Sequence, residues 1–286
     1  MKKIKKILLI YKETVYKRHF LRRDVWKHSC GPGSGVIRRL KEADRRHMST
    51  LLSVEKELQR RRLNYSKRRR GSKVLRRHFD LVISVGGDGT FMEAASRLTR
   101  QMICGVNSDP CRSIGRFCST DSRGFPGLLD QILSGKATIL ALERLRVTHK
   151  GKTQEALNDV LICHENPAAM SHYLLKVGKT LEEQRSSGLW VSTPAGSSGA
   201  IHSAGGRRMG LTSRRFQYRP RELYVPCGRS YQLRGGLYPL SRPLNVVSLM
   251  TEGLVCLDGS NVVFPFSFGD KIKITRSSLP LRVLGL

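Results

Sequence analysis

The feature that most constrains the fold is an apolar run that ends in a glycine-rich turn. Residues 79–85 read Phe-Asp-Leu-Val-Ile-Ser-Val, and Gly86-Gly87-Asp88-Gly89-Thr90 follows directly. A run that is apolar on both faces is typical of a central strand in a parallel sheet. Glycine reaches backbone angles closed to other residues and lets a bulky anion approach the chain. The segment therefore predicts a buried strand, a phosphate-binding turn and a helix over 90–98.

The turn carries one acidic residue, Asp88. Bound phosphates would repel a carboxylate unless it held Mg²⁺ or accepted a proton from an attacking hydroxyl. The alternative is a plain strand-to-helix turn in which Asp88 caps the helix. Five specified residues directly after an apolar strand favour the phosphate site.

The N-terminal half alternates predicted strands with predicted helices. Residues 4–11 are short, apolar and β-branched, and apolar residues recur at helical spacing over 36–63. A further strand is predicted at 102–106 and a further helix at 121–133. This alternation predicts a doubly wound α/β domain over about 1–135.

After Gly135 the sequence changes to short strand patterns with few helices. The predicted strands are 138–149, 153–163, 172–178, 188–193, 221–226, 244–250, 252–257, 261–266 and 271–276. Asp258-Gly259 between two apolar runs is a hairpin signal. The expected fold is therefore α/β, with a second domain over 136–265 that is β-rich and β-sandwich-like.

The chain is strongly basic, with 52 Lys and Arg against 22 Asp and Glu and a net charge of +30. Such a charge attracts polyanions of any kind, including nucleotides and nucleic acid. The densest basic stretch lies between Arg60 and Arg77, and we interpret it as a solvated helix end and loop. RNA affinity or guidance of an anionic substrate remains the alternative, although the sequence has no RNA-recognition motif, KH loop or zinc finger.

The remaining composition predicts a cytoplasmic protein. No apolar run approaches the ~20 residues that span a bilayer, and the apolar start at 4–10 is too short for a signal peptide. The seven cysteines form no C-x-x-C pair, so we expect buried, reduced thiols. The histidines show no metal-binding spacing.

Three segments in order resemble the NAD kinase family. The glycine turn is the first, although diacylglycerol and sphingosine kinases and phosphofructokinases share it. Ala156-Leu157-Asn158-Asp159 resembles the family's Asn-Glu/Asp motif, and residues 185–206 resemble its long Thr-Pro-x-Gly-Ser segment. The resemblance covers nearly the whole chain. It is greatest to plant-type NADH kinases and related bacterial proteins, on Gly105-Val106-Asn107-Ser108-Asp109-Pro110 and Arg185-Ser186-Ser187-Gly188 together with Asp258-Gly259-Ser260.

The resemblance implies phosphate transfer from ATP, with Mg²⁺ or another divalent cation, to the adenosine 2′-hydroxyl of NAD⁺ or NADH. Asp88 would be the catalytic base. The implied phosphate contacts are Gly86, Gly87, Gly89, Thr90 and Asn107. The implied dinucleotide contacts are Asp88, Gly89, Asn158, Asp159, Arg185, Ser187, Ser198, Gly199, Ala200 and Ser203. No side chain is assigned as a direct metal ligand.

Two positions depart from the family pattern, because Ser187 replaces the usual aspartate and Ala200 the usual tyrosine. Both departures bear on the balance between NAD⁺ and NADH. The resemblance also implies a homo-oligomer (dimer or tetramer), a return of residues 266–286 to the first domain, and a site between the domains. Two alternatives remain. One is a lipid kinase that shares the glycine turn, although the sequence shows no apolar membrane anchor; the other is a basic nucleic-acid-binding protein on a kinase-like fold.

Overall fold

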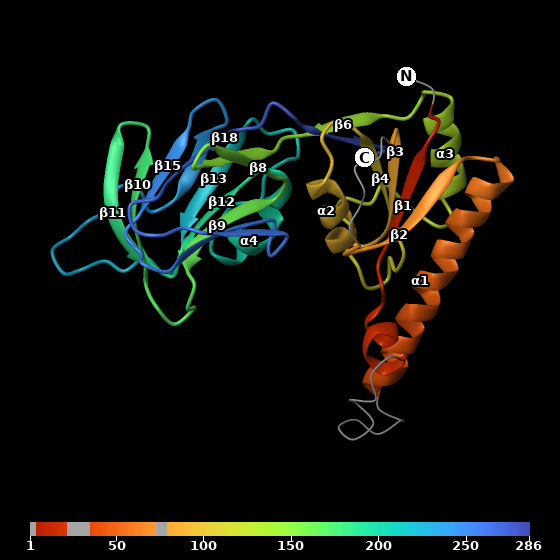
Figure 1. Cartoon of the computed structure of the whole chain (residues 1–286), viewed down its shortest axis with the longest axis horizontal. Helices are drawn as coiled ribbons and strands as arrows, with labels where there is room; N and C mark the ends of the chain where they lie inside the picture. The colour runs from red at the N-terminus through yellow and green to blue at the C-terminus, as the bar shows by residue number, and fades with distance from the viewer. Residues whose placement is uncertain (1–3, 22–34, 73–78) are drawn as a thin grey trace. The chain divides into compact units, whose positions relative to one another are not determined.

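The computed structural model describes residues 4–21, 35–72 and 79–286 (Figure 1). The chain divides into two compact units. The first contains Met1–Leu140 and Arg282–Leu286, and the second contains Ala141–Leu281.

The first unit is built on a sheet in the order β2-β1-β3-β4-β19-β6, with β5 paired to β4. The pairs from β2 through β19 are parallel. The strands are β1 (Ile7–Tyr11), β2 (Tyr65–Arg69), β3 (Leu81–Gly86), β4 (Met102–Asn107), β5 (Thr120–Asp121), β6 (Ile139–Leu142) and β19 (Leu281–Leu284). The helical segments are η1 (Lys17–Leu21), α1 (Gly35–Arg60), α2 (Asp88–Ser96) and α3 (Phe125–Leu133).

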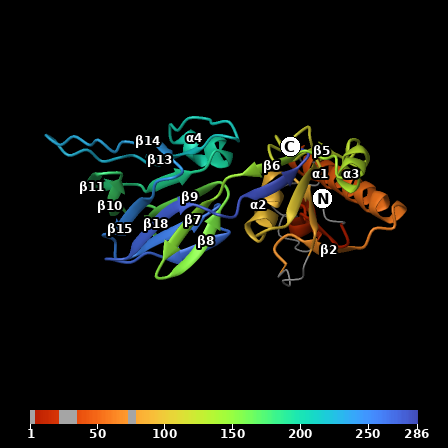
Figure 2. The same ribbon diagram turned by 90° about the horizontal axis from the view of Figure 1, so that it is seen from above.

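Helices cover both faces of this sheet. Figures 1 and 2 both show α2 on one face and α1 with α3 on the other. The α1 side chains Leu51, Val54 and Leu58 recur at helical spacing and are buried against Leu9 and Ile83 of the sheet. Each strand of the β1-β3-β4 centre is apolar on both faces for this reason. The doubly wound arrangement predicted from the sequence is confirmed.

The second unit contains two six-stranded antiparallel sheets. One has the order β11-β10-β15-β18-β7-β8 and the other β14-β13-β12-β9-β16-β17. Their strands are β7 (Leu145–His149), β8 (Lys152–Ala156), β9 (Asp159–His164), β10 (Ser171–Val177), β11 (Thr180–Ser186), β12 (Leu189–Ser192), β13 (Arg215–Pro220), β14 (Gly236–Pro239), β15 (Leu244–Ser248), β16 (Gly253–Leu257), β17 (Val262–Pro265) and β18 (Lys271–Arg276). Two short helical turns, η3 (Ala195–Ser198) and α4 (Ala200–Ser203), follow β12.

One core joins the two sheets of this unit. Tyr173 and Ile274 come from the first sheet and Val191, Phe216 and Val255 from the second, and all belong to one buried cluster. The alternating burial along β10 and β18 fits strands with one face on that core. The β-rich, sandwich-like class predicted from the sequence is confirmed.

The limits of the two units differ from the predicted ones. The sequence placed the boundary near 135, and the structure divides the chain after Leu140. Of the segment 266–286, β19 joins the first unit's sheet, whereas β18 lies within a sheet of the second unit. The reason is its pattern, since Ile272 and Ile274 are buried while Lys271 and Lys273 are exposed, which suits a half-buried antiparallel strand.

The basic stretch 60–77 was predicted as a helix end and a loop, and this was wrong in part. The chain leaves α1 at Arg60 and then forms β2, which pairs parallel with β1. As an edge strand with one partner, β2 needs little apolar burial, so its sequence gives no strand signal. Residues 73–78 lie outside the described residues.

Other predicted details also change. The predicted strand 221–226 is irregular, whereas β11, β13 and β14 were not predicted. The six described cysteines are free, but Cys111 and Cys227 are exposed rather than buried. Among the helices of the described segments, none has the length and apolarity needed to cross a membrane.

Candidate active site

The glycine turn joins β3 to α2 with almost no room for side chains. A Cβ on Gly86 would lie 2.4 Å from Oγ1 of Thr90, and one on Gly87 would lie 2.6 Å from Oγ of Ser113. Thr90 is buried, so it cannot easily move aside. The packing therefore requires glycine at Gly86, whereas at Gly87 a side chain would have to displace the Ser113 hydroxyl.

The start of α2 offers backbone N–H groups to an anion. The carbonyl oxygen of Gly87 accepts the N–H of Thr90 at 2.9 Å and that of Phe91 at 3.2 Å. The first-turn N–H groups of a helix have no intrahelical acceptors, so those of Asp88 and Gly89 are the ones available in this turn. The positive end of the helix adds attraction for a phosphate.

The Asp88 carboxylate is held by a neighbouring loop. Its Oδ1 accepts the backbone N–H of Phe117 at 2.9 Å. Phe117 is itself fixed, because its ring stacks on Phe91 of α2 with centroids 5.4 Å apart. Among the described residues, no donor is bonded to the second carboxylate oxygen. Asp88 is only half-buried, so that oxygen can serve a bound hydroxyl.

A thiol lies behind the turn. Sγ of Cys118 is 3.9 Å from the carbonyl oxygen of Gly86. Burial, with a further contribution from the Asp88 charge, raises the pKa of Cys118 to about 12. The thiol is therefore neutral at physiological pH.

Asn107 lies beside the turn, opposite Gly86 in the β3–β4 register. Its Nδ2 donates to the carbonyl oxygen of Ser113 at 3.0 Å, and its Oδ1 accepts the N–H of Asp109 at 3.0 Å. Gly115 has a φ of +59°, and a Cβ there would lie 2.3 Å from Nδ2 of Asn107. The side chain thus shapes the loop that places Ser113 against Gly87.

In the second unit, the connection between β8 and β9 carries Asn158 and Asp159. The carboxylate of Asp258 accepts the N–H groups of Leu157 at 2.9 Å, Asn158 at 2.7 Å and Asp159 at 3.3 Å. Oδ1 of Asn158 is buried and has no hydrogen-bond partner within the described part of the chain. An acceptor without a donor at such a place suits a ligand hydroxyl.

Two carboxyl groups share this buried region. Burial first, and then the charge of Asp258, raise the pKa of Asp159 to about 7. Burial also raises the pKa of Asp258, against the opposing effect of its three backbone donors and Arg144. Asp159 therefore changes protonation near neutral pH and can act there as a donor or an acceptor.

The segment after β12 packs directly on this pair. Ser192 lies opposite Asp159 in the β9–β12 register, and Thr193 N–H donates to the carbonyl oxygen of Asn158 at 2.9 Å. A Cβ on Gly196 would lie 2.2 Å from that same oxygen, and one on Gly199 would lie 4.0 Å from Oδ2 of Asp159. The structure thus brings together the two predicted motifs of this unit.

A comparison with individual known proteins identifies the family, although no family model matches the chain. It is 34% identical over 274 residues to the probable NADH kinase of Oryza sativa subsp. japonica, and the match covers 87% of this chain and 84% of that protein. The chain belongs to the NAD kinase family. The predicted resemblance is confirmed and is favoured over the lipid-kinase and nucleic-acid-binding alternatives.

Two solved NAD kinase-family structures share the fold. The NAD kinase of Archaeoglobus fulgidus in complex with ATP has a TM-score of 0.68 at 21% identity, covering 97% of this chain and 92% of that one. Yeast NADH kinase complexed with NADH has a TM-score of 0.69 at 16% identity, covering 100% of this chain and 84% of that one. Because both sequence identities are below 25%, these two structures establish the fold of the chain and nothing more.

The remaining predicted site residues lie in η3, in α4 and at the end of β11. Ser198, Ala200 and Ser203 lie in η3 and α4, next to the Gly196–Gly199 segment. Arg185 is exposed on β11, and Ser187 follows that strand, donating its N–H to the carbonyl oxygen of Arg221 at 3.0 Å. In the β9–β12 pair, Ser192 at the last position of β12 lies opposite Asp159. Ser187 comes before Leu189, at the other end of β12. Within this unit, Arg185 and Ser187 are not gathered with Asn158.

Sequence reasoning missed the role of Asp258. Its Asp-Gly pair was interpreted as a hairpin signal and as part of the family resemblance, with no role for the side chain, and Asp258 does occupy that turn, with a φ of 51°. A turn aspartate is normally solvated, so nothing in the local sequence marks this one as buried. Arg144, only 2% exposed, was missed as well; its charge helps to stabilise the ionised form of Asp258.

Proposed function

We propose that this chain transfers the γ-phosphate of ATP to the 2′-hydroxyl of the adenosine ribose of NAD⁺ or NADH, which yields NADP⁺ or NADPH. Membership of the NAD kinase family supports the reaction class. The observation that supports the chemistry is the position of Asp88. This residue begins α2, and its Oδ1 accepts a hydrogen bond from the backbone N–H of Phe117.

Asp88 acts as the general base in this proposal. Because Phe117 fixes one carboxylate oxygen, the other is presented in a defined direction to the ribose hydroxyl. Removing the proton as the oxygen attacks phosphorus contributes roughly 10²–10⁴-fold to the rate. The N–H groups of Asp88 and Gly89 and the helix end offset charge on the transferred phosphoryl group.

Mg²⁺ would enter this site bound to ATP. Among the described residues, no group of three His, Cys, Asp or Glu side chains is arranged to hold a metal. Mg²⁺ ordinarily takes one or two carboxylates together with substrate phosphates and water. Because Asp88 stays free to accept the proton, the phosphates of ATP and water would supply the ligands of the ion, and the ion would neutralise the phosphate charge.

The proposal assigns the dinucleotide to Asn158, Asp159 and the Gly196–Gly199 segment. Neighbouring ribose hydroxyls need an acceptor and a group that both donates and accepts. Asn158 supplies a buried oxygen with no partner among the described residues, and Asp159 has a pKa of about 7. The glycines supply backbone that a ligand can approach. A homo-oligomeric, cytoplasmic enzyme is part of the proposal, on the basis of the family resemblance.

The test is direct formation of NADP⁺ and NADPH by the purified chain with ATP and Mg²⁺, using NAD⁺ and NADH in parallel. Diacylglycerol serves as the competing acceptor. We expect phosphorylation of at least one dinucleotide and none of the lipid. A well-folded protein that phosphorylates neither dinucleotide would overturn the proposal.

A further inference from the structure

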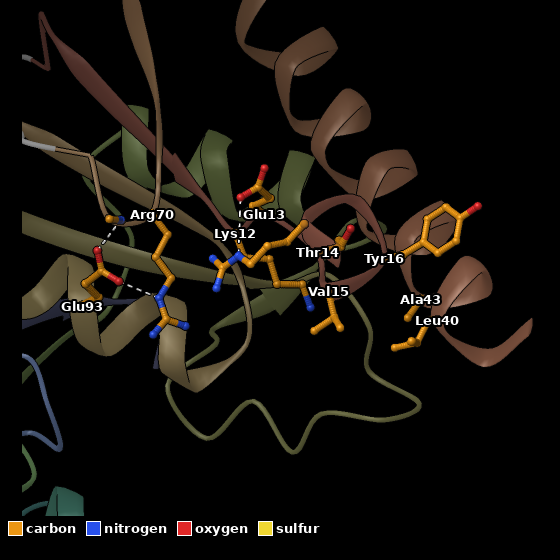
Figure 3. A pocket seen from close by; sticks show the side chains of 11 residues that line it. Lys12, Glu13, Thr14, Val15, Tyr16, Leu40, Ala43, Arg70 and Glu93 are labelled. Atoms are coloured by element: carbon orange, nitrogen blue, oxygen red, sulfur yellow. Dashed lines mark hydrogen bonds and ion pairs between the residues drawn. The ribbon is translucent and has the colours of Figure 1, made fainter. Parts of the chain in front are cut away.

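A cavity of about 490 Å³ opens at the carboxyl end of β1 (Figure 3). Its charged wall includes Lys12, Arg70 and Glu93, and its apolar wall includes Val15 and Leu40. This volume lies in the range that holds small-molecule ligands. None of the residues assigned above to the dinucleotide or to the reacting atoms lines it.

The cavity adjoins the glycine turn. Tyr11 pairs with Val85 in the parallel β1–β3 register, so Lys12 leaves the sheet at the same edge as Gly86. On the other side, a Cβ added to Gly89 would lie 3.2 Å from Nη1 of Arg70. The Arg70 guanidinium therefore packs against the backbone of the turn at Gly89, and Arg70 also lines the cavity.

The charges in this cavity are unevenly paired. Arg70 bonds to Glu93 at 2.5 Å, and Arg18 lies 3.5 Å from Glu13. The Lys12 ammonium has no carboxylate within ion-pair distance among the described residues. Burial lowers the pKa of Lys12, and the charges of Asp109 and then Cys118 only partly oppose this effect.

Asp109 is paired with Arg46 instead, since its carboxylate accepts a hydrogen bond from Nε of Arg46 at 2.8 Å. A partly desolvated ammonium without an anion is unfavourable, and an incoming phosphate would remove that cost. The charges of Asp88 and Lys12 both act on the pKa of Cys118, in opposite directions.

We propose that this cavity binds the phosphate chain of the phosphate donor, with Lys12 as its principal cation and Arg70 at the edge of the turn. The inference rests on the proposed phosphotransfer at Asp88. A donor must place its terminal phosphate at the glycine turn and needs cations for the phosphates behind it. The apolar wall at Val15 and Leu40 gives a nucleotide base a contact that inorganic polyphosphate lacks.

The first experiment measures steady-state kinetics of Lys12→Gln, Lys12→Arg and Lys56→Gln. Lys56 is exposed on α1, so its variant removes the same charge away from the cavity. Loss of a charged hydrogen bond predicts that Lys12→Gln raises the KM for ATP about tenfold or more, with the KM for NAD⁺ within about twofold. Lys12→Arg restores part of the affinity, and Lys56→Gln changes neither constant. A rise in the KM for NAD⁺ alone, or no change for ATP, overturns the inference.

A second experiment uses the unmodified chain and so does not depend on variants that fold. An amine-reactive acylating reagent labels the protein, and mass spectrometry follows the rate at Lys12. ATP and tripolyphosphate should each slow labelling at Lys12 but not at Lys56, and NAD⁺ should not. Stronger protection by ATP identifies a nucleotide donor, whereas equal protection identifies the phosphate chain alone as the recognised group.

Absence of protection by both anions overturns the cavity assignment. These outcomes are separable from failure of the proposed function. A chain that makes no NADP⁺ or NADPH contradicts phosphotransfer whatever the labelling shows. A chain that makes NADP⁺ with an unprotected Lys12 contradicts only the cavity.

Discussion

The backbone N–H of Asn158 donates to Oδ1 of Asp258 at 2.7 Å, across 100 residues of sequence. Leu157 and Asp159 donate to the same carboxylate. Asp258 lies in the turn between β16 and β17, so this hairpin fixes the connection that presents Asn158. The conformation of the Asn158–Asp159 connection therefore depends on two segments that lie far apart in the sequence.

Replacing Asp258 by alanine should weaken both the fold and the site. Three backbone N–H groups lose their acceptor, and each unsatisfied buried group costs about 1–3 kcal/mol. We expect the free energy of unfolding in urea to fall by about 2–4 kcal/mol. The KM for NAD⁺ should rise about tenfold, while that for ATP changes little. Glu165→Ala, at an exposed acid of the same unit, is the control; equal effects of the two substitutions would contradict this role for Asp258.

The raised pKa of Asp159 predicts a pH-dependent stability. The unfolded carboxyl loses its proton near its ordinary pKa of 3.8, whereas the folded one keeps it to about 7. The native state thus binds more protons in this window, so the free energy of unfolding should fall as the pH rises from about 4 to about 7. Asp159→Asn has no proton to lose and should flatten this part of the profile. Urea unfolding across the window measures it, and identical slopes for both proteins would contradict the assignment.

Sequence predicts best where one local pattern decides the structure. The apolar strand, the glycine turn and helix α2 follow from residues 79–98 alone, since the strand is buried on both faces and Gly86 packs against Thr90. β2 could not be predicted because its sequence, Tyr-Ser-Lys-Arg-Arg, has no apolar pattern. This edge strand forms through its backbone pairing with β1. The burial of Asp258 could not be predicted for a related reason. The three backbone N–H groups that donate to its carboxylate lie about 100 residues away in the sequence.

The close packing of Gly196 gives a steric prediction. A Cβ there would lie 2.2 Å from the carbonyl oxygen of Asn158, which is backbone and cannot rotate away. Gly196→Ala should therefore lower the free energy of unfolding by about 2–3 kcal/mol and raise the KM for NAD⁺. Gly127→Ala is the matched control, because Gly127 lies within α3 with nothing within 4 Å of its added Cβ. It should stabilise by about 0.5–1 kcal/mol, so the two substitutions should have opposite signs.

Asp88→Asn separates the chemical role of this residue from its structural one. The asparagine Oδ1 can still accept the Phe117 N–H, so the turn and the midpoint of thermal unfolding should be preserved. Loss of a general base lowers kcat by roughly 10²–10⁴-fold, while the dissociation constant for NAD⁺ should stay within about threefold. Asp130→Asn, at an exposed acid on α3 that pairs with Arg61, controls for removal of a negative charge from the same unit. Undiminished kcat in a folded Asp88→Asn protein would remove Asp88 from proton transfer. A loss of kcat accompanied by unfolding would instead assign the carboxylate to holding the Phe117 loop, because a base that only accepts a proton has no reason to change the thermal midpoint.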